Sequence, residues 1–393
     1  MHPPRFPLQK LPRNAATGQA RGRLSTRRAG PRVVLYSAAM SNKTAIVAGA
    51  SGLIGRRISE HLRDSGWDVI GLARRPAATP GVRWLGVDLT DAGDCKARLR
   101  GLDCVTHLFY AARFDHPEGK PEDVETNTAM LKNLVDVLER HAPLEHVHAV
   151  HGSKYYGHQL GPVPVPLRED TPRAANRNYY FDQEDLLIER SRGARWTYST
   201  SRPHAFCDAA IDHPRSIGLV FAVYAAIQRE LGLTFDFPGG ARGYDARTQF
   251  TDLRLLARAV VWMASEPRCA NESFNVVNGD YPRWGDLWAA FAQWFGVEAG
   301  APRKFSLAEY MADKAPVWEK IVAAHGLRRT KLHELALWAY GDYQVRPDWE
   351  VESSMDKARA LGFMTSLDSF DMFRRQYQNY RAENVMPRMG VFS

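Results

Sequence analysis

Short apolar runs alternate with amphipathic segments along the first half of the chain. An apolar run at 44–48 stops at a glycine-rich turn, and a helical pattern follows at 53–65. Further strand patterns occur at 68–73, 105–110, 146–150 and 196–200, and further helical patterns at 121–141 and 181–190. Such alternation is typical of parallel strands covered by helices on both faces. It predicts an α/β fold with a Rossmann-type, doubly wound parallel sheet.

Beyond about residue 204 the pattern changes. Helical patterns dominate there, and the one further strand pattern is at 273–277. We expect a Rossmann domain over 42–204 and a smaller, mostly helical lobe over 205–393, with 273–277 returning to the first sheet. Ligands of such sheets bind at the carboxyl edge of the strands, so the lobe is expected to cover that edge and to hold the substrate.

The positive charge of the chain is concentrated near its start. The 393 residues have a formal net charge of +8. Residues 1–40 contain eight basic and no acidic side chains, which leaves 44 of each in the rest of the chain. The excess therefore belongs to a tail and not to a nucleic-acid-binding face. Residues 1–41 are predicted to be a disordered basic tail; a misassigned start is the favoured explanation, and a targeting peptide is the alternative.

The remaining composition is typical of a soluble globular protein, for which we expect a cytoplasmic location. Hydrophobic residues make up 45% of the chain and charged residues 24%. No apolar run is long enough to span a membrane, so no membrane partner is expected. The four cysteines have no metal-ligand spacing, which predicts reduced thiols and no metal site.

The glycine-rich turn after the first strand is a dinucleotide-binding pattern. Glycines here permit a tight turn, the close approach of a pyrophosphate and the packing of the helix on the sheet, and the helix N-terminus offers free N–H groups to the phosphates. The position between a strand and a helix distinguishes this pattern from a plain tight turn. The predicted cofactor-binding residues of this turn are Gly49, Ser51, Gly52, Leu53, Ile54 and Gly55.

The end of the second strand predicts which dinucleotide is bound. An NAD site places an acidic residue there for the ribose hydroxyls, whereas this chain has Arg74 and Arg75. Two guanidinium groups suit a 2′-phosphate and favour NADPH; the alternative is that they lie on a solvated loop. Asp88 and Leu89 follow where such enzymes often contact the adenine, and helix capping by Asp88 is the alternative.

A tyrosine without its usual lysine is the strongest catalytic signal. In short-chain dehydrogenases the catalytic Tyr is followed four residues later by Lys, but here Tyr180 is followed by Glu184. A glutamate cannot hold a ribose or lower the pKa of a phenol as a cation can. Lys154, in the loop after the 146–150 strand, is expected to supply the missing ammonium. His151 in the same loop is interpreted as a hydrogen-bonded residue, with a catalytic base as the alternative.

These segments together resemble the progesterone 5β-reductase and iridoid synthase-like enzymes, an atypical branch of the extended short-chain dehydrogenases. The resemblance runs from about Lys43 to the C-terminus and includes the segments 49–55, 73–76, 106–110, 152–156, 178–185, 223–227 and 271–280. It implies NADPH-dependent 1,4-reduction of the activated C=C bond of an enone or enal. It also implies that Tyr180 and Lys154 are the catalytic pair that stabilises the enolate.

The chain departs from the plant members of that family around the substrate. Arg113 stands where they carry an aromatic pocket residue, and the stretch between Lys154 and Tyr180 is shorter. Steroid or iridoid specificity is therefore not carried over. Arg113, Tyr156 and His204 are the candidate residues of the substrate pocket.

Two other functions are compatible with an extended short-chain dehydrogenase fold. A nucleotide-sugar epimerase or dehydratase needs a working Tyr-x-x-x-Lys, and Glu184 argues against it. A non-catalytic NADP-binding sensor commonly lacks the active Tyr, whereas this chain keeps Tyr180 and Lys154. The expected partner is a small-molecule enone or enal, and a homodimer is compatible with the sequence.

Overall fold

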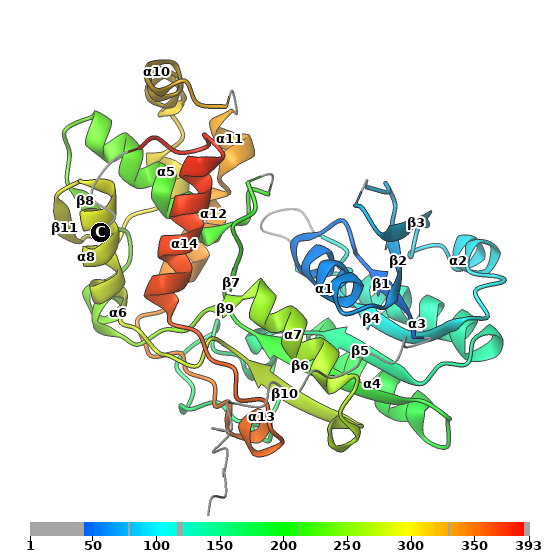
Figure 1. Cartoon of the computed structure of the whole chain (residues 1–393). Helices are drawn as coiled ribbons and strands as arrows, with labels where there is room; N and C mark the ends of the chain where they lie inside the picture. The colour runs from blue at the N-terminus through cyan, green and yellow to red at the C-terminus, as the bar shows by residue number, and fades with distance from the viewer. Residues whose placement is uncertain (1–42, 78, 116–120, 212, 329–330, 389–393) are drawn as a thin grey trace, which may run out of the picture. The chain divides into compact units, whose positions relative to one another are not determined.

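A seven-stranded parallel sheet takes six strands from residues 44–203 and its seventh from residues 272–276 (Figure 1). The computed structural model describes residues 43–77, 79–115, 121–211, 213–328 and 331–388, so the predicted tail at 1–41 lies outside the described residues. The strands of the sheet are β1 (Thr44–Ala48), β2 (Asp68–Ala73), β3 (Val82–Gly86), β4 (Val105–Tyr110), β5 (His146–Val150), β6 (Thr197–Pro203) and β10 (Glu272–Val276).

The strand order places a ligand crevice next to β1. The order is β10-β6-β5-β4-β1-β2-β3, so the chain builds outward from β1 in one direction and then from β4 in the other. The order reverses between β1 and β4, which pair from Ala45 to Ala48 against His107 to Tyr110. In doubly wound sheets the crevice at the carboxyl ends of such a strand pair receives the ligand.

Both faces of the sheet are covered by helices, as the sequence pattern predicts. Along β1, Ala45 and Val47 pack into one apolar cluster, whereas Ile46 and Ala48 pack into another. Helices α1 (Leu53–Asp64) and α7 (Leu253–Met263) pack on the first face, and α2 (Ala92–Arg98), α3 (Val124–His141) and α4 (Tyr179–Ser191) on the second (Figure 1). Because successive side chains of a strand point to opposite faces, β1 is buried on both and reads as a continuous apolar run.

Side-chain caps decide where two of these helices begin. The predicted helix at 121–141 starts at Val124, because the Asp123 carboxylate accepts a hydrogen bond from the Thr126 N–H. The helix predicted at 181–190 starts at Tyr179, because Asn178 caps it by accepting from the Tyr180 N–H at 3.0 Å. Such caps satisfy N–H groups that have no partner within the helix.

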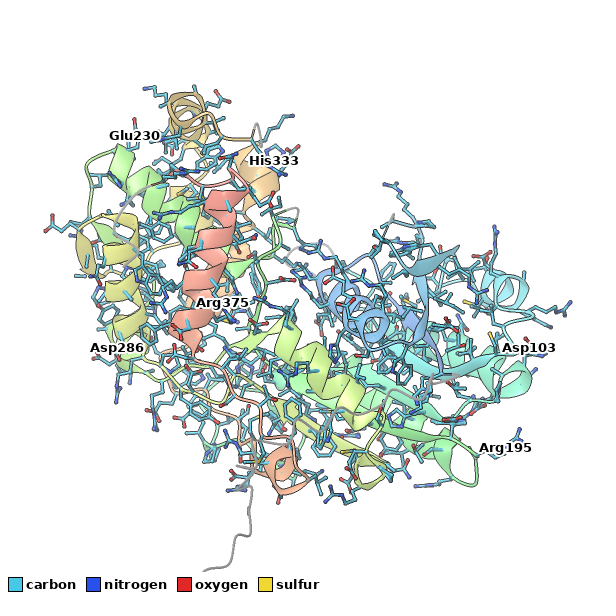
Figure 2. The ribbon with its side chains drawn as sticks, viewed as in Figure 1. Asp103, Arg195, Glu230, Asp286, His333 and Arg375 are labelled. Carbon is cyan, nitrogen blue, oxygen red and sulfur yellow. The ribbon has the colours of Figure 1, made fainter. Side chains whose placement is uncertain are left out.

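The C-terminal lobe is built around α5 (Ile217–Glu230). Twelve successive residues of α5, Ile217 to Gln228, are buried, as expected of a helix enclosed by others. Arg375 on the last helix, labelled in Figure 2, joins this lobe to the base of α7 through an ion pair with Asp252 at 3.4 Å. The other elements of the described chain are η1 (Ser153–Tyr156), β7 (Phe206–Cys207), β8 (Phe235–Phe237), α6 (Ala241–Asp245), β9 (Thr251–Asp252), η2 (Pro267–Cys269), α8 (Trp284–Phe295), β11 (Ala299–Pro302), α9 (Leu307–Tyr310), α10 (Ala315–His325), α11 (Leu332–Leu335), α12 (Trp338–Val345), α13 (Asp356–Ala360) and α14 (Ser369–Ala382).

Three buried histidines, His107 on β4 and His146 and His148 on β5, lie in the middle of the sheet. His146 contacts the hydroxyl of Ser199 at 2.8 Å, and His148 contacts the same hydroxyl at 2.8 Å. Burial lowers the pKa of His107 to about 4 and that of His146 to about 3, and it takes the pKa of His148 well below its usual range. These rings are therefore neutral in the folded protein at neutral pH.

These three buried histidines predict a loss of stability in mild acid. Above the unfolded pKa of about 6.5 both states hold neutral rings; below it the unfolded chain binds protons that the folded chain does not. The free energy of unfolding should therefore fall from about pH 6.5 downward, by up to about 1.4 kcal/mol per pH unit for each histidine. Urea unfolding at pH 7.5, 6.0 and 5.0 measures this slope. His148→Gln should flatten it relative to a matched His333→Gln change at the surface; equal stability at all three pH values would contradict the prediction.

No helix of the described part of the chain is both long and apolar enough to cross a membrane.

Candidate active site

The glycine-rich turn fits tightly between β1, α1 and the end of β4. Gly49 has φ +77°, and a Cβ there would lie 2.9 Å from the backbone of Ala111 and Ala112. A Cβ on Gly55 would lie 2.2 Å from the Gly49 carbonyl oxygen. Gly52 is the N-cap of α1 and provides no side-chain cap. The turn therefore needs glycine at 49 and 55, and the first N–H groups of α1 remain available to an anion.

The other residues of the predicted cofactor site lie around this turn. Ser51 is exposed, Ile54 is half-buried and Leu53 is buried in the core beneath the turn. Arg74 and Arg75 follow β2, and both are exposed. No carboxylate of the described residues forms an ion pair with either arginine, so both guanidinium groups can turn to a phosphate.

Asp88 has a local structural partner. Its carboxylate accepts from the Thr90 N–H at 3.0 Å and from the Thr90 hydroxyl at 2.8 Å, and these bonds lower the pKa of Asp88. The cap of α2 is Asp91, which accepts from two N–H groups of that helix, so helix capping does not occupy Asp88. Leu89 is buried, and its carbonyl oxygen accepts from Asn133.

Tyr180 is held at the start of α4 by its neighbours. Its ring stacks on His151 with centroids 5.0 Å apart, and it meets Tyr179 edge-on at 4.5 Å. Its hydroxyl lies against Gly152, where an added Cβ would be only 3.0 Å from that oxygen. Burial, followed by the nearby Tyr179 hydroxyl, raises the pKa of Tyr180 well above its usual range. The phenol is therefore protonated at neutral pH and can donate a hydrogen bond.

Lys154 lies in η1, the turn that follows β5. Its Nζ binds the Glu122 carboxylate at 2.8 Å, and Arg113 binds the same oxygen at 3.1 Å. A free ammonium at Lys154 would lower the pKa of Tyr180. In this structure Glu122 neutralises that ammonium, and burial raises the pKa of Tyr180 instead. Glu122 was not identified from the sequence. It precedes α3 in a loop with no motif, and only the fold brings it to Lys154.

His151 is buried beside this pair. Its ring nitrogens make no close hydrogen bond among the described residues, and Gln183 is the side chain that interacts with the ring. Burial lowers its pKa to about 4, so the ring is neutral. The ring packs on the face of Tyr180, and the interpretation of His151 as a hydrogen-bonded residue stays a prediction.

A cavity of about 1070 Å³ opens over Tyr180 and Lys154. Its walls come from the loops after β4, β5 and β6 and from the C-terminal lobe. Among the candidate pocket residues Arg113 and His204 line this cavity. Tyr156 is buried behind it, where its hydroxyl donates to Asn275 at 2.7 Å. The residues that line the sheet side are Arg113, Gly152, Ser153, Lys154, His158, Tyr180, Pro203, His204, Ala205 and Phe206.

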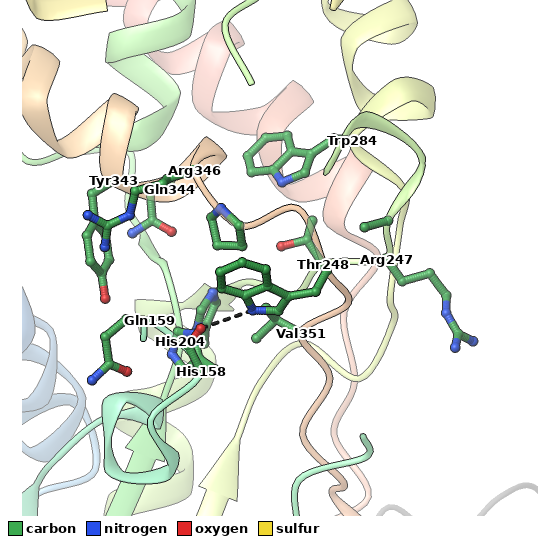
Figure 3. Close-up of a pocket in the computed structure, with 13 residues that line it drawn as sticks. His158, Gln159, His204, Arg247, Thr248, Trp284, Tyr343, Gln344, Arg346 and Val351 are labelled. Atoms are coloured by element: carbon green, nitrogen blue, oxygen red, sulfur yellow. Dashed lines mark hydrogen bonds between the residues drawn. The ribbon is translucent and has the colours of Figure 1, made fainter. Parts of the chain in front are cut away.

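A second, smaller pocket, drawn in Figure 3, shares His158 and His204 with the wall of the cavity. The Ser153 hydroxyl contacts His204 at 2.6 Å and His158 at 3.1 Å, so the two rings of this wall are tied together. The Trp349 indole N–H donates to the His158 carbonyl oxygen at 3.0 Å, the dashed line of Figure 3. No group of three or more His, Cys, Asp or Glu side chains in the described chain is arranged to hold a metal ion.

Comparison with known proteins finds relatives that match most of the chain. Residues 77–387 match the PRISE-like Rossmann-fold domain. A relative is the (S)-8-oxocitronellyl enol synthase of Nepeta racemosa, 32% identical over 87% of this chain and 91% of its own length. Another is the 3-oxo-Delta(4,5)-steroid 5-beta-reductase of Arabidopsis thaliana, 31% identical over 87% of this chain and 93% of its own length.

Solved structures show the same fold at low sequence identity. A short-chain dehydrogenase/reductase superfamily protein from Agrobacterium tumefaciens with bound NAD has a TM-score of 0.62 at 16% identity, covering 86% of this chain and 97% of its own. A putative epimerase from Burkholderia cenocepacia has a TM-score of 0.61 at 19% identity, covering 87% of this chain and 99% of its own. These two structures cover as much of the chain as the two relatives do, but at 16% and 19% identity, so they show the fold alone. The chain belongs to the PRISE-like family of Rossmann-fold oxidoreductases.

Proposed function

We propose that this protein reduces the activated C=C bond of an enone or enal by 1,4-addition, with NADPH as the hydride donor. The observation that carries the proposal is the cavity at the carboxyl edge of the sheet, whose wall contains both a protonated Tyr180 and Lys154. The family relatives named as enol synthase and steroid reductase support a reaction of this class.

The residues around the first turn fit a dinucleotide phosphate. Gly49 and Gly55 leave no room for a side chain, and the N-terminus of α1 carries no side-chain cap. These groups would hold the pyrophosphate of NADPH, and Arg74 with Arg75 would hold its 2′-phosphate. When bound there, NADPH supplies the hydride to the β-carbon of the substrate.

Tyr180 acts on the carbonyl oxygen of the substrate. Addition of hydride to the β-carbon moves electrons onto that oxygen, and a donor already in place stabilises the enolate without reorganisation. A phenol with a raised pKa keeps its proton at neutral pH and presents it to the oxygen. Lys154 provides a positive charge in the same cavity wall. Its Nζ acts on a ligand when it binds that ligand in addition to the Glu122 carboxylate. Gly152 leaves the space that the hydroxyl needs.

The decisive test follows NADPH consumption and identifies the product. The full-length protein is mixed with NADPH and a panel of small enones and enals, and with saturated ketones of the same size as controls. We expect consumption with the unsaturated substrates and a saturated ketone or aldehyde as the product. Reduction of the saturated ketones to alcohols would contradict 1,4-reduction. Retention of tightly bound NAD without net consumption would favour an epimerase, and NADPH binding without turnover would favour a sensor.

Arg74 and Arg75 are predicted to select NADPH over NADH. Charge-assisted hydrogen bonds contribute about 1.5–3 kcal/mol, so Arg74→Ala with Arg75→Ala should weaken NADPH binding at least about tenfold. NADH has no 2′-phosphate, and its Kd should change by less than about twofold. Titration of both cofactors by fluorescence measures the two constants. Exposed Arg83→Ala, on β3, is the matched control; equal weakening of both cofactors by the double change would contradict the assignment.

A further inference from the structure

Glu184, the residue in place of the usual lysine, has a dense set of buried partners. Its side chain is 6% exposed and receives the guanidinium groups of Arg202 at 3.0 Å and Arg173 at 2.8 Å. It also accepts from the Tyr155 hydroxyl at 2.7 Å and from Ser273 at 2.8 Å. One carboxylate therefore links α4 to the turn η1, to β6, to β10 and to the loop before α4.

The same network holds both residues that follow Lys154. The Arg202 guanidinium lies 3.5 Å from the centre of the Tyr155 ring, a close cation–π contact. Arg202 also donates to the Tyr156 hydroxyl at 3.0 Å, and that hydroxyl donates to Asn275. The backbone that carries Lys154 is thus held at its next two positions by groups that Glu184 orients.

The charge of Glu184 is permanent at physiological pH. Burial by itself would raise its pKa, but the Arg202 guanidinium and the other donors lower that pKa to about 2. Buried ion pairs pay for their desolvation and contribute little net stability compared with apolar side chains of the same size, while they do restrict the arrangement of the groups they join. A network of this kind at the base of η1 is therefore explained better by the geometry it imposes than by stability alone.

We infer that Glu184 is a positioning residue: through Tyr155 and Arg202 it holds the turn η1 on helix α4, and so places Lys154 relative to Tyr180. The inference rests on the proposed reaction for its consequence in catalysis. It also explains why a cation is not accepted at this position. A lysine at 184 would face Arg202 and Arg173 instead of a ribose. The ammonium group therefore comes from Lys154 in η1, and the Glu184 carboxylate holds that turn in place.

A double-mutant cycle tests whether Glu184 acts through Lys154. Glu184→Gln keeps the shape and removes the charge, and Glu189→Gln makes the same change at an exposed position of α4. With an active enone, we expect Glu184→Gln to lower kcat about tenfold or more while the Kd for NADPH changes by less than about twofold. In a Lys154→Ala background the same change should lower kcat by less than about twofold further. Glu189→Gln should change neither.

Two results would overturn the inference. If kcat falls by the same factor in both backgrounds, Glu184 acts on the fold in general and not through Lys154. If Glu184→Gln leaves kcat unchanged, it does not position the site. Should Glu184→Gln fail to fold, Tyr155→Phe removes the hydroxyl that joins η1 to Glu184 and to Arg173, and the same cycle is run with it.

A second readout separates this inference from the proposed function. Lys154 is 30% exposed, so its ammonium can be acetylated by a water-soluble active ester and quantified by peptide mass spectrometry. We expect Glu184→Gln or Tyr155→Phe to raise the acetylation rate of Lys154 at least about threefold, with the exposed Lys132 side chain of α3 as the internal reference. An unchanged rate would overturn the placement of Lys154 by Glu184. A wild type that reduces no enone, with a raised rate in the variants, would instead reject the proposed reaction only.

Discussion

Tyr180→Phe should lower kcat for enone reduction by about 10²–10⁴, the range typical of a lost proton donor. The change keeps the ring, so the stack on His151 and the edge contact with Tyr179 remain. Only the hydroxyl that faces the cavity beside Gly152 is lost. The Kd for NADPH should change by less than about twofold, because the phenol acts on the substrate oxygen. Steady-state kinetics with a reactive enone and a cofactor titration measure the two effects.

The control is the same chemical change away from the cavity. Tyr224→Phe removes a buried hydroxyl in the C-terminal lobe, where it donates to the Asp236 carbonyl oxygen, and should leave kcat unchanged. Lys154→Ala should also slow turnover, and the double variant with Tyr180→Phe should be little worse than the poorer single one, since parts of one catalytic unit are not additive. Full activity in Tyr180→Phe would reject the donor role and favour other donors in the cavity.

Gly55→Ala should weaken NADPH binding at least about tenfold and lower the stability of the protein. The added Cβ would lie 2.2 Å from the Gly49 carbonyl oxygen and 2.9 Å from the Ala50 Cα, so backbone must move. Overpacking of this kind costs about 1–3 kcal/mol, and here the displaced turn is the one that would hold the pyrophosphate. Thermal unfolding with and without NADPH measures both effects, since a bound ligand raises Tm.

A matched glycine separates the local clash from the general cost of losing a glycine. A Cβ on Gly161 would meet no atom within 4 Å, so Gly161→Ala should leave both Tm and NADPH affinity unchanged. If Gly55→Ala behaved like Gly161→Ala, the tight contact between the turn and α1 would not matter for the cofactor, and the assignment of the turn would lose its main support.

The sheet and its covering helices were predictable from local pattern. The bounds expected for β2, β4 and β5 are those of the structure, because a strand buried on both faces is a short, continuous apolar run between turn residues. The short elements β3 and α2 were not predicted. The C-terminal lobe was predicted only as helical, because its many short helices are set by packing around α5 and carry weak periodicity of their own.

The partners of the catalytic candidates were not predictable. The sequence indicates Tyr180 and Lys154, but not that Glu122 holds the lysine or that Gly152 makes room for the phenol. Glu122 is 32 residues from Lys154 along the chain, and no spacing rule joins two loops of a doubly wound sheet. The position of the Tyr156 side chain was not predictable either. Its segment, 152–156, borders the cavity, but the side chain points to Asn275.

The sequence by itself determined the fold class, the glycine turn, the pair of arginines and the unusual Tyr180 with Glu184, because each depends on residues close together in the chain. Only the tertiary structure decided what Glu184 does. Its partners Tyr155, Arg202 and Ser273 come from three other elements, and their convergence depends on the order of the strands β5, β6 and β10. A buried carboxylate is tolerated only where such donors meet it, and that meeting is a property of the folded sheet.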